Sequence, residues 1–244
     1  MMKFLPFIAA TLLALPAAAQ VDCNAGMEPI DRTADFALTA SDFVKSIATN
    51  EQKFSKALGG FSYDIDIKVE TLDGDTVDGE YHRASKMAFE GGTRRQTVAD
   101  GAVNTLKRLK LSDRDIAVLG DPASYILDGE SFANRDIVYS GRQKMADHNY
   151  AIFDALPRSS VSAETGHGFE GRTWVRGRYR AIAKTCGRSN DFPVAFLRFS
   201  TLREPVAETN YFPVLVMADE TMPIDNAQVH VRVTVKFSNY RAKP

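Results

Sequence analysis

The chain has 244 residues, of which 44% are hydrophobic and 25% charged, and its formal net charge is −1. This balance argues against a nucleic-acid partner, because binding to nucleic acid normally requires a basic face. The length suits one large β domain or two small domains, and it can bury a core without disulfide bonds. Beyond the N-terminus, no apolar run approaches the roughly 20 residues that a membrane-spanning helix needs.

Residues 1–19 have the pattern of a secretory signal peptide. Lys3 precedes an apolar run over residues 4–15, and the alanines at 17–19 satisfy the small-x-small cleavage rule. The run is shorter than the roughly 20 residues of a bilayer span. We therefore expect the mature protein to begin near Gln20 or Val21 and to reside in the periplasm of a Gram-negative bacterium.

Two cysteines remain in the expected mature chain, Cys23 and Cys186. An isolated pair in an exported protein is often a disulfide, which here would join the mature N-terminus to the last third of the chain. The alternative is two unpaired thiols, because pairing requires Cα atoms about 4.4–6.8 Å apart. Lipidation of Cys23 is rejected, because Val21 and Asp22 precede it where a lipoprotein signal has a small residue.

A single strong helix is predicted near the mature N-terminus. Residues 20–38 contain Gly, Pro and Asp without a period and are predicted to be irregular. Residues 40–58 then follow a helical period, with a cap at Thr39 or Ser41 and a stop at residues 59–60. The apolar stripe of this helix consists of Phe43, Ile47, Phe54 and Leu58, with Val44 and Ala48 at its edge.

From residue 61 the period changes to two. Odd positions of 61–72 are apolar or aromatic and even positions are polar, which predicts a half-buried strand with one solvated face. A hairpin turn at 72–75 leads to a partner strand over 77–90, and a third strand covers 93–98. The last strand, 229–240, alternates in the same way.

Residues 100–135 interrupt the strand pattern. Ser112–Asp115 predict a capped short helix that ends at residues 121–122, and the sequence near 123–127 is compatible with a further helical turn. Strands are then predicted over 136–142, 148–156, 169–175, 179–185, 195–204 and 212–219. This series of roughly nine or ten strands with hairpin-like connections favours an antiparallel meander over parallel βαβ units.

A large antiparallel sheet must cover one apolar face. One strong helix and one short helical insertion favour a sheet that curls around them. We therefore predict a mainly β (α+β) fold, in which a strongly curved antiparallel sheet forms an open half-barrel covered by an N-terminal helix and a short helical insertion. It would occupy residues 39–244 as a single domain, after the signal peptide 1–19 and the irregular segment 20–38.

The order of several short motifs is similar to a known family. The motifs are 138–142 (VYSGR), 169–175 (FEGRTWV), 202–206 (LREPV), 211–213 (YFP), 218–221 (ADET), 229–232 (VHVR) and 237–240 (FSNY). In their order and spacing the chain resembles the outer-membrane lipoprotein-sorting proteins of the periplasmic lipoprotein-carrier superfamily. The resemblance covers about residues 50–242 and implies an open half-barrel with helices lining its mouth. It also implies binding of acyl chains or sensing of the envelope state, and it supplies no catalytic residues.

The apolar faces of the first and last strands are the candidate ligand site. They consist of Tyr63, Ile65, Ile67, Val69, Val231, Val233 and Val235. These side chains either line a cavity for an apolar ligand or form an ordinary core beneath the predicted helix.

A second candidate surrounds the only tryptophan, Trp174. Arg172, Arg176, Arg178 and Arg180 share its strand phase, and a row of guanidinium groups beside an aromatic ring can contact an anionic headgroup. For this contact we single out Trp174, Arg176 and Arg178. The alternative is an exposed basic strand paired with acids on a neighbouring strand.

Catalytic signatures are weak in this sequence. The four histidines lack the spacing of a zinc site, and Ser159, Ser160 and Ser162 have no Gly-x-Ser-x-Gly context. Residues 166–168 (GHG) favour a turn, and Asp64 and Asp66 favour a solvated strand face. We therefore expect no metal, no cofactor and no enzymatic activity, although a hydrolase remains a third hypothesis.

The leading functional hypothesis is a non-catalytic periplasmic binding protein for a lipid-like group or a lipoprotein acyl chain. The alternative is an envelope protein–protein interaction or stress-sensing module that binds no lipid. Both follow from the export signal, the two-faced strands and the family resemblance.

Overall fold

A computed structural model describes residues 22–35, 39–99, 101–133, 135–158, 168–177, 180–189, 198–206 and 210–243. The expected signal peptide lies outside these residues, as do Arg178, Ser159, Ser160, Ser162 and His167.

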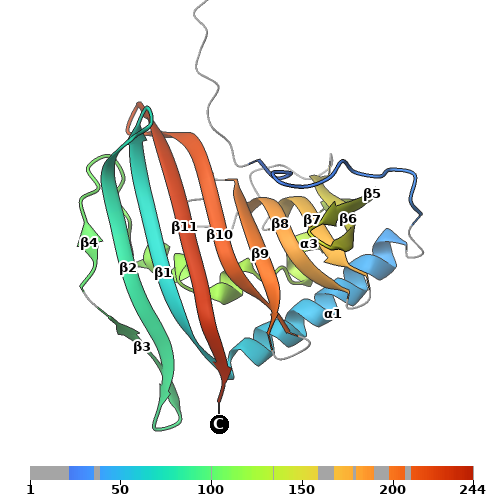
Figure 1. Ribbon diagram of the computed structural model, residues 1–244, viewed down its shortest axis with the longest axis horizontal. Coiled ribbons are helices and arrows are strands. Elements are labelled where there is room, and N and C mark those ends of the chain that lie inside the picture. Colours follow the sequence, from blue (N-terminus) through green and yellow to red (C-terminus); the bar gives the residue numbers. More distant parts are fainter. Residues whose placement is uncertain are drawn as a thin grey trace, which may run out of the picture.

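One antiparallel sheet contains all eleven strands of the described residues, and it is not closed into a barrel (Figure 1). The strands are β1 (Phe61–Asp73), β2 (Thr76–Glu90), β3 (Thr93–Val98), β4 (Val103–Asn104), β5 (Arg135–Met145), β6 (His148–Pro157), β7 (Phe169–Arg176), β8 (Ala181–Ser189), β9 (Phe199–Val206), β10 (Asn210–Ile224) and β11 (Ala227–Ala242). They lie side by side in the order β3-β2-β1-β11-β10-β9-β8-β7-β6-β5, with β4 beside β2.

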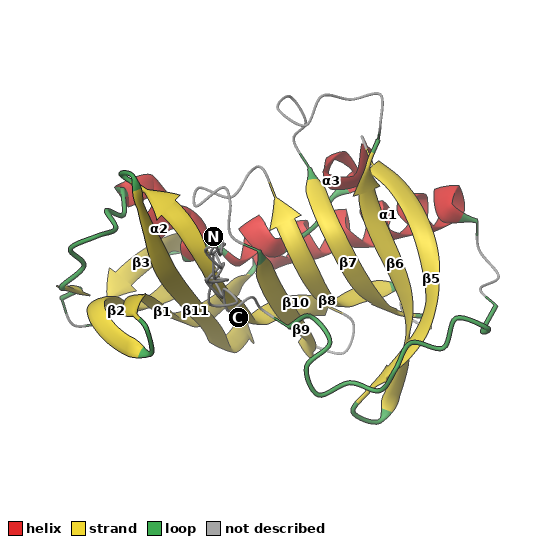
Figure 2. Cartoon of the chain, turned by 90° about the horizontal axis from the view of Figure 1, so that it is seen from above, coloured by secondary structure: helices red, strands yellow, loops and turns green. Residues whose placement is uncertain are grey.

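The helices lie together on one face of this curved sheet, which we call the inner face (Figures 1 and 2). They are α1 (Ala40–Leu58), α2 (Asp113–Leu119), the short 3-10 helix η1 (Pro122–Tyr125) and α3 (Gly129–Ala133). We call these four elements the helical cover and the opposite face of the sheet the outer face. The predicted fold class, an open and mainly β sheet covered by helices, is confirmed.

The alternation of β1 explains how the sheet acquires two different faces. Its odd residues from Phe61 to Val69 are buried, whereas the even residues Ser62 to Lys68 are partly exposed. β1 pairs with β11 in a register that places Ile67 opposite Val235 and Val69 opposite Val233. Paired residues point to the same face, so the apolar phases of the first and last strands combine into one inner surface.

Helix α1 has the predicted bounds and cap. The Thr39 side chain accepts a hydrogen bond from the Asp42 backbone N–H at 3.1 Å, and Gly59 caps the C-terminus. The four residues of the predicted apolar stripe are buried against the sheet, and the Phe43 ring stacks on Phe153 of β6. Burial of this stripe holds the longest helix of the described residues across the inner face.

The structure differs from the prediction in the length and number of some elements. β10 and β11 extend to a two-residue turn at Asp225-Asn226, whose positive φ values of 46° and 66° are those of a tight hairpin turn. These strands were predicted to end at residue 219 and to begin at residue 229, so the structure extends both of them toward the turn. Helix α3 and the two-residue strand β4 were not predicted, since neither is long enough to produce a period.

Candidate functional site

The seven predicted cavity residues come together on the inner face, as the β1–β11 pairing requires. Each of them is at most 2% exposed, because the helical cover and neighbouring aromatic rings pack on them. The Tyr63 ring lies 5.3 Å from that of Tyr240, and burial raises the pKa of Tyr63 to about 12. The Tyr125 ring of η1 lies 5.9 Å from that of Phe237. These side chains therefore pack as a core.

A buried ion pair joins the helical cover to the sheet. Glu51 of α1 and Arg203 of β9 form a salt bridge in which neither side chain is exposed to solvent. Glu51 also accepts the backbone N–H of Leu127 at 2.9 Å, and Arg203 donates to the carbonyl oxygen of Tyr125. Burial raises the pKa of Glu51, and the Arg203 guanidinium opposes that shift. Two side chains thus hold α1, β9 and the end of η1 together.

This pair was not predicted from the sequence, although the sequence contains a signal for each partner. Glu51 occupies the apolar stripe of α1, four residues after Ile47 and three before Phe54. Arg203 follows Phe199 and Thr201 in the buried phase of β9. A charged residue in an apolar phase indicates a buried partner, because an unpaired buried charge is costly.

Four polar atoms near this pair are buried without a hydrogen-bond partner among the described residues. They are Oε1 of Glu51, Nε of Arg203, Oγ1 of Thr201 and Oγ1 of Thr185. The two threonines face each other across β8 and β9. An unsatisfied buried polar group costs roughly 1–3 kcal/mol. The interior beneath α1 is therefore less stable than a fully apolar interior of the same shape.

A cavity of about 270 Å³ adjoins this polar interior at the edge of the helical cover. It is lined by Ser124, Ile126, Leu127, Asp128, Glu130, Ser131 and Ser189. Leu127, whose backbone N–H binds Glu51, is part of the lining. The cavity thus lies beside the contact that closes the cover.

On the outer face, residues 22–35 form a segment that crosses β8 to β5, and we call it the N-terminal strap (Figure 2). A disulfide joins Cys23 of the strap to Cys186 of β8, with their Cα atoms 5.7 Å apart. At the far end, Asp31 and Arg142 exchange two backbone hydrogen bonds of 2.7 and 2.8 Å. The strap is therefore fastened covalently at one end and by strand-like bonds at the other.

Trp174 lies under side chains that the strap holds. Its indole N–H donates to Gln143 at 2.7 Å, and Lys184 lies 5.0 Å from the ring centroid. Gln143 in turn donates to the carbonyl oxygen of Glu28, and Lys184 donates to that of Cys23. Burial lowers the pKa of Lys184. The ring is 0% exposed, so contact with a headgroup stays a prediction that requires these side chains to move.

The arginines that alternation predicts to stand in one row bind separate partners in the structure. Arg172 makes a bidentate salt bridge to Asp154, with distances of 2.7 and 3.0 Å. Arg176 donates to the hydroxyl of Tyr211 at 3.0 Å and contacts His148. Arg178 lies outside the described residues. The headgroup role of Arg176 and Arg178 therefore remains a prediction.

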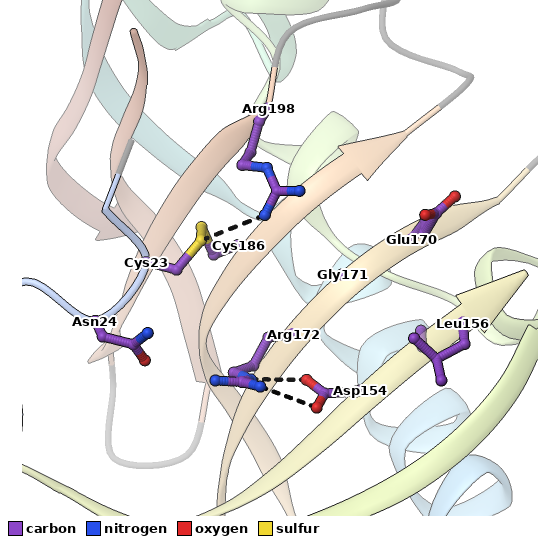
Figure 3. A pocket seen from close by; sticks show the side chains of 10 residues that line it. Cys23, Asn24, Asp154, Leu156, Glu170, Gly171, Arg172, Cys186 and Arg198 are labelled. Atoms are coloured by element: carbon purple, nitrogen blue, oxygen red, sulfur yellow. Dashed lines mark hydrogen bonds and ion pairs between the residues drawn. A yellow bond between two sulfur atoms is a disulfide. The ribbon is translucent and has the colours of Figure 1, made fainter. Parts of the chain in front are cut away.

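Two cavities lie beside the strap on the outer face, and Figure 3 shows the first of them. One of about 350 Å³ is lined by Cys23, Asn24, Asp154, Ala155, Leu156, Glu170, Gly171, Arg172, Cys186 and Arg198. The other, of about 420 Å³, is lined by Asn24, Met27, Glu28, Pro29, Ile30, Arg32, Gln143 and Arg172. Asn24 and Arg172 line both cavities, so the two are adjacent, and we refer to them together as the groove along the strap.

Among the described residues, the histidines and aspartates that the sequence offered as weak candidates for a metal or catalytic site lie on the solvated outer face. Asp66 contacts His82 at 3.1 Å, and His230 contacts Asp219. Asp64 accepts a hydrogen bond from Asn239. Across the part of the chain that is described, no three His, Cys, Asp or Glu side chains are placed to hold a metal ion. Within the same residues, every helix is too short or too polar to cross a lipid bilayer.

Solved structures that resemble this chain are LolA superfamily and outer-membrane lipoprotein-sorting domain proteins. A lipoprotein-sorting domain from Vibrio parahaemolyticus has 7% identity and a TM-score of 0.45, over 84% of this chain and 93% of that one. A LolA superfamily protein from Nitrosomonas europaea has 8% identity and a TM-score of 0.39, over 85% and 95%. A DUF1329 family protein from Desulfovibrio piger has 12% identity and a TM-score of 0.42, over 83% and 92%.

No protein-family model matches the sequence, and no curated protein matches it. The likeness to the solved structures therefore concerns the fold.

Replacing Arg203 with Met leaves the Glu51 carboxylate buried without its cation. We expect the free energy of unfolding to fall by about 3–5 kcal/mol. In the matched control, Arg232→Met breaks the outer-face salt bridge to Asp219, which is 3.0 Å long, and we expect a loss of at most about 1 kcal/mol. Urea unfolding followed by circular dichroism measures both losses. Equal losses would contradict the role assigned to the buried ion pair.

The Asp154–Arg172 pair predicts a dependence of stability on pH. Burial pushes the pKa of Asp154 upward, but hydrogen bonds from Arg172 and Ser140 bring it below the ordinary value of 3.8. The pKa of Asp154 is lower in the folded state than in the unfolded state. The stabilisation that this carboxylate provides is therefore complete above the unfolded-state pKa, and it is lost as the pH falls from that value through the folded-state pKa. The stability difference between wild type and Asp154→Asn should be constant from pH 7 to about 5 and shrink below pH 3.8. A difference that does not change with pH would disprove this.

Proposed function

We propose that this protein is a non-catalytic periplasmic binding protein for a lipid-like group or a lipoprotein acyl chain. The exported chain would follow the signal peptide 1–19, and the binding domain would be the single half-barrel of residues 39–244. The ligand would occupy the inner face once the helical cover moves away from it. The observation that carries the proposal is the buried ion pair, which closes an apolar surface with a polar contact.

An acyl chain is the natural substitute for the helical cover on this surface. Tyr63, Ile65, Ile67, Val69, Val231, Val233 and Val235 form a continuous apolar patch across β1 and β11. Each buried methylene group contributes about 0.8 kcal/mol, so a long chain can offset the apolar contacts that α2 and η1 lose when they move. Affinity would then come from burial alone, and no catalytic group is needed.

The polar interior favours a cover that opens. Glu51 and Arg203 gain hydration when they separate from their buried positions, and the unpaired Thr185 and Thr201 hydroxyls reach water. Buried ion pairs are often less stabilising than apolar replacements of similar volume. The cavity beside Leu127 would be the entrance. Trp174, Arg176 and Arg178 could contact an anionic headgroup outside this entrance only after rearrangement, and we retain that contact as part of the proposal.

An envelope protein partner is the second candidate function. Val138 of β5 is 45% exposed and Leu156 of β6 is 47% exposed. Leu156 also lines the groove along the strap. Apolar side chains beside a polar groove are typical of surfaces that bind another protein. In this alternative the inner face stays closed and no lipid is bound.

Acyl-chain uptake by the mature chain tests the proposal. The protein, expressed with its signal peptide and purified without detergent, should carry extractable lipid by mass spectrometry and enhance the emission of a fluorescent fatty-acid probe. The double variant Glu51→Leu with Arg203→Met should be about 1–4 kcal/mol more stable and bind the probe more weakly, because its cover closes with an apolar contact.

The matched control for uptake is the double variant Asp219→Leu with Arg232→Met, which makes the same replacements in an outer-face pair. It should bind the probe like wild type. Wild-type protein that carries no lipid and binds no probe would refute the proposal. Capture of one stoichiometric envelope protein by such lipid-free material would favour the alternative.

A further inference from the structure

The disulfide of the strap lines a cavity on the outer face, at the edge of the buried core. Both Cys23 and Cys186 line the outer-face cavity of about 350 Å³ (Figure 3). Cys186 is 1% exposed, whereas Cys23 is only partly buried. A small thiol can therefore approach the sulfur of Cys23 from the groove, while Cys186 is shielded behind it.

A positive charge stands at the sulfur that the groove exposes. A guanidinium nitrogen of Arg198 lies 4.0 Å from Sγ of Cys23 (Figure 3). The backbone N–H of Arg198 donates to Glu220 at 2.7 Å, which fixes the start of β9 at this place. The Nε atom of Arg198 is buried and makes no hydrogen bond within the described residues. A nearby guanidinium attracts an incoming thiolate and stabilises a departing one.

We propose that Cys23–Cys186 is a thiol–disulfide exchange site, and that its reduction by a dithiol releases the N-terminal strap from the outer face. The reductant would be a dithiol protein or a small dithiol that enters the groove. This inference is independent of acyl-chain binding on the inner face.

The exchange proceeds in two balanced steps. A thiolate of the dithiol attacks Sγ of Cys23, a mixed disulfide forms, and Cys186 leaves as a thiolate that takes a proton from water. The second thiol of the reductant, as its thiolate, then attacks the reductant's own sulfur in the mixed disulfide. The reductant becomes an internal disulfide, and Cys23 leaves as a thiolate beside Arg198. Two electrons pass from the dithiol to the protein.

Release of the strap would change the surroundings of Trp174, because two strap carbonyl groups hold the side chains that contact its ring. The carbonyl oxygen of Cys23 holds Lys184, and the carbonyl oxygen of Glu28 holds Gln143. Both of these side chains contact the indole. Once the strap leaves, they lose these partners and water reaches the ring. Because Trp174 is the only tryptophan of the chain, its fluorescence reports the position of the strap directly.

The rate of reduction in native buffer tests the proposal. Dithiothreitol should reduce the wild-type disulfide without denaturant, and Trp174 emission should shift to longer wavelength at the same rate. Arg198→Gln should slow this reaction by about two- to fivefold, the effect of one charge near the surface. The neutral reductant tris(3-hydroxypropyl)phosphine should reduce both proteins at nearly equal rates, because it carries no thiolate.

Arg188→Gln is the matched control. Arg188 binds the same Glu220 but does not line the cavity of the disulfide, so its removal should leave the dithiothreitol rate unchanged. Reduction that requires a urea concentration that unfolds the whole protein would overturn the proposal, because it would make the disulfide purely structural. So would an unchanged rate in Arg198→Gln, or a disulfide that is reduced while Trp174 emission stays constant.

Discussion

The buried Glu51–Arg203 pair is the contact on which the closed inner face depends. Its partners belong to α1 and β9, and the same two side chains bind the backbone at Tyr125 and Leu127. An apolar sheet face can be covered by apolar contacts alone, so a charged contact there needs a physical reason. Under the proposed function, reversible closure would supply one, because charges that are costly to bury would regain water when the cover opens.

The sheet is covered differently along its width. At β1 and β11 the inner face is buried, and the outer face carries ion-paired side chains such as Lys68, Glu70 and Arg232. At β7 both faces are covered, by α1 on one side and by the side chains that the strap holds on the other. Thr173, Trp174 and Val175 are consequently buried in succession. The β1–β11 part of the sheet thus has two layers, sheet and helical cover, and the β7 part has a third layer, the strap. The Glu51–Arg203 ion pair holds the cover, and the Cys23–Cys186 disulfide holds the strap.

The buried face was predicted correctly for elements that bury a single face, whereas β7, whose bounds were also predicted, is buried on both faces. β1, β11 and α1 alternate or repeat cleanly, so their bounds and their apolar faces could be predicted from residue spacing. The buried ion pair joins residues 152 positions apart, and no local period reveals such a partner. Trp174 was predicted to contact an anionic headgroup together with arginines of its strand phase, whereas side chains held by the strap bury the ring in this structure. The ion pair and the burial of Trp174 both result from contacts between segments far apart in the chain, which local residue patterns do not show.

Native-state hydrogen exchange tests the central claim most directly, because it measures the opening of each element separately. If the inner face is closed by a displaceable cover, amides of α1 and η1 should exchange through openings of lower free energy than those of β1 and β11. Addition of the fatty-acid probe should change the exchange of the cover more than that of the sheet. Cover and sheet amides that all exchange only through global unfolding, with one common free energy, would contradict the account.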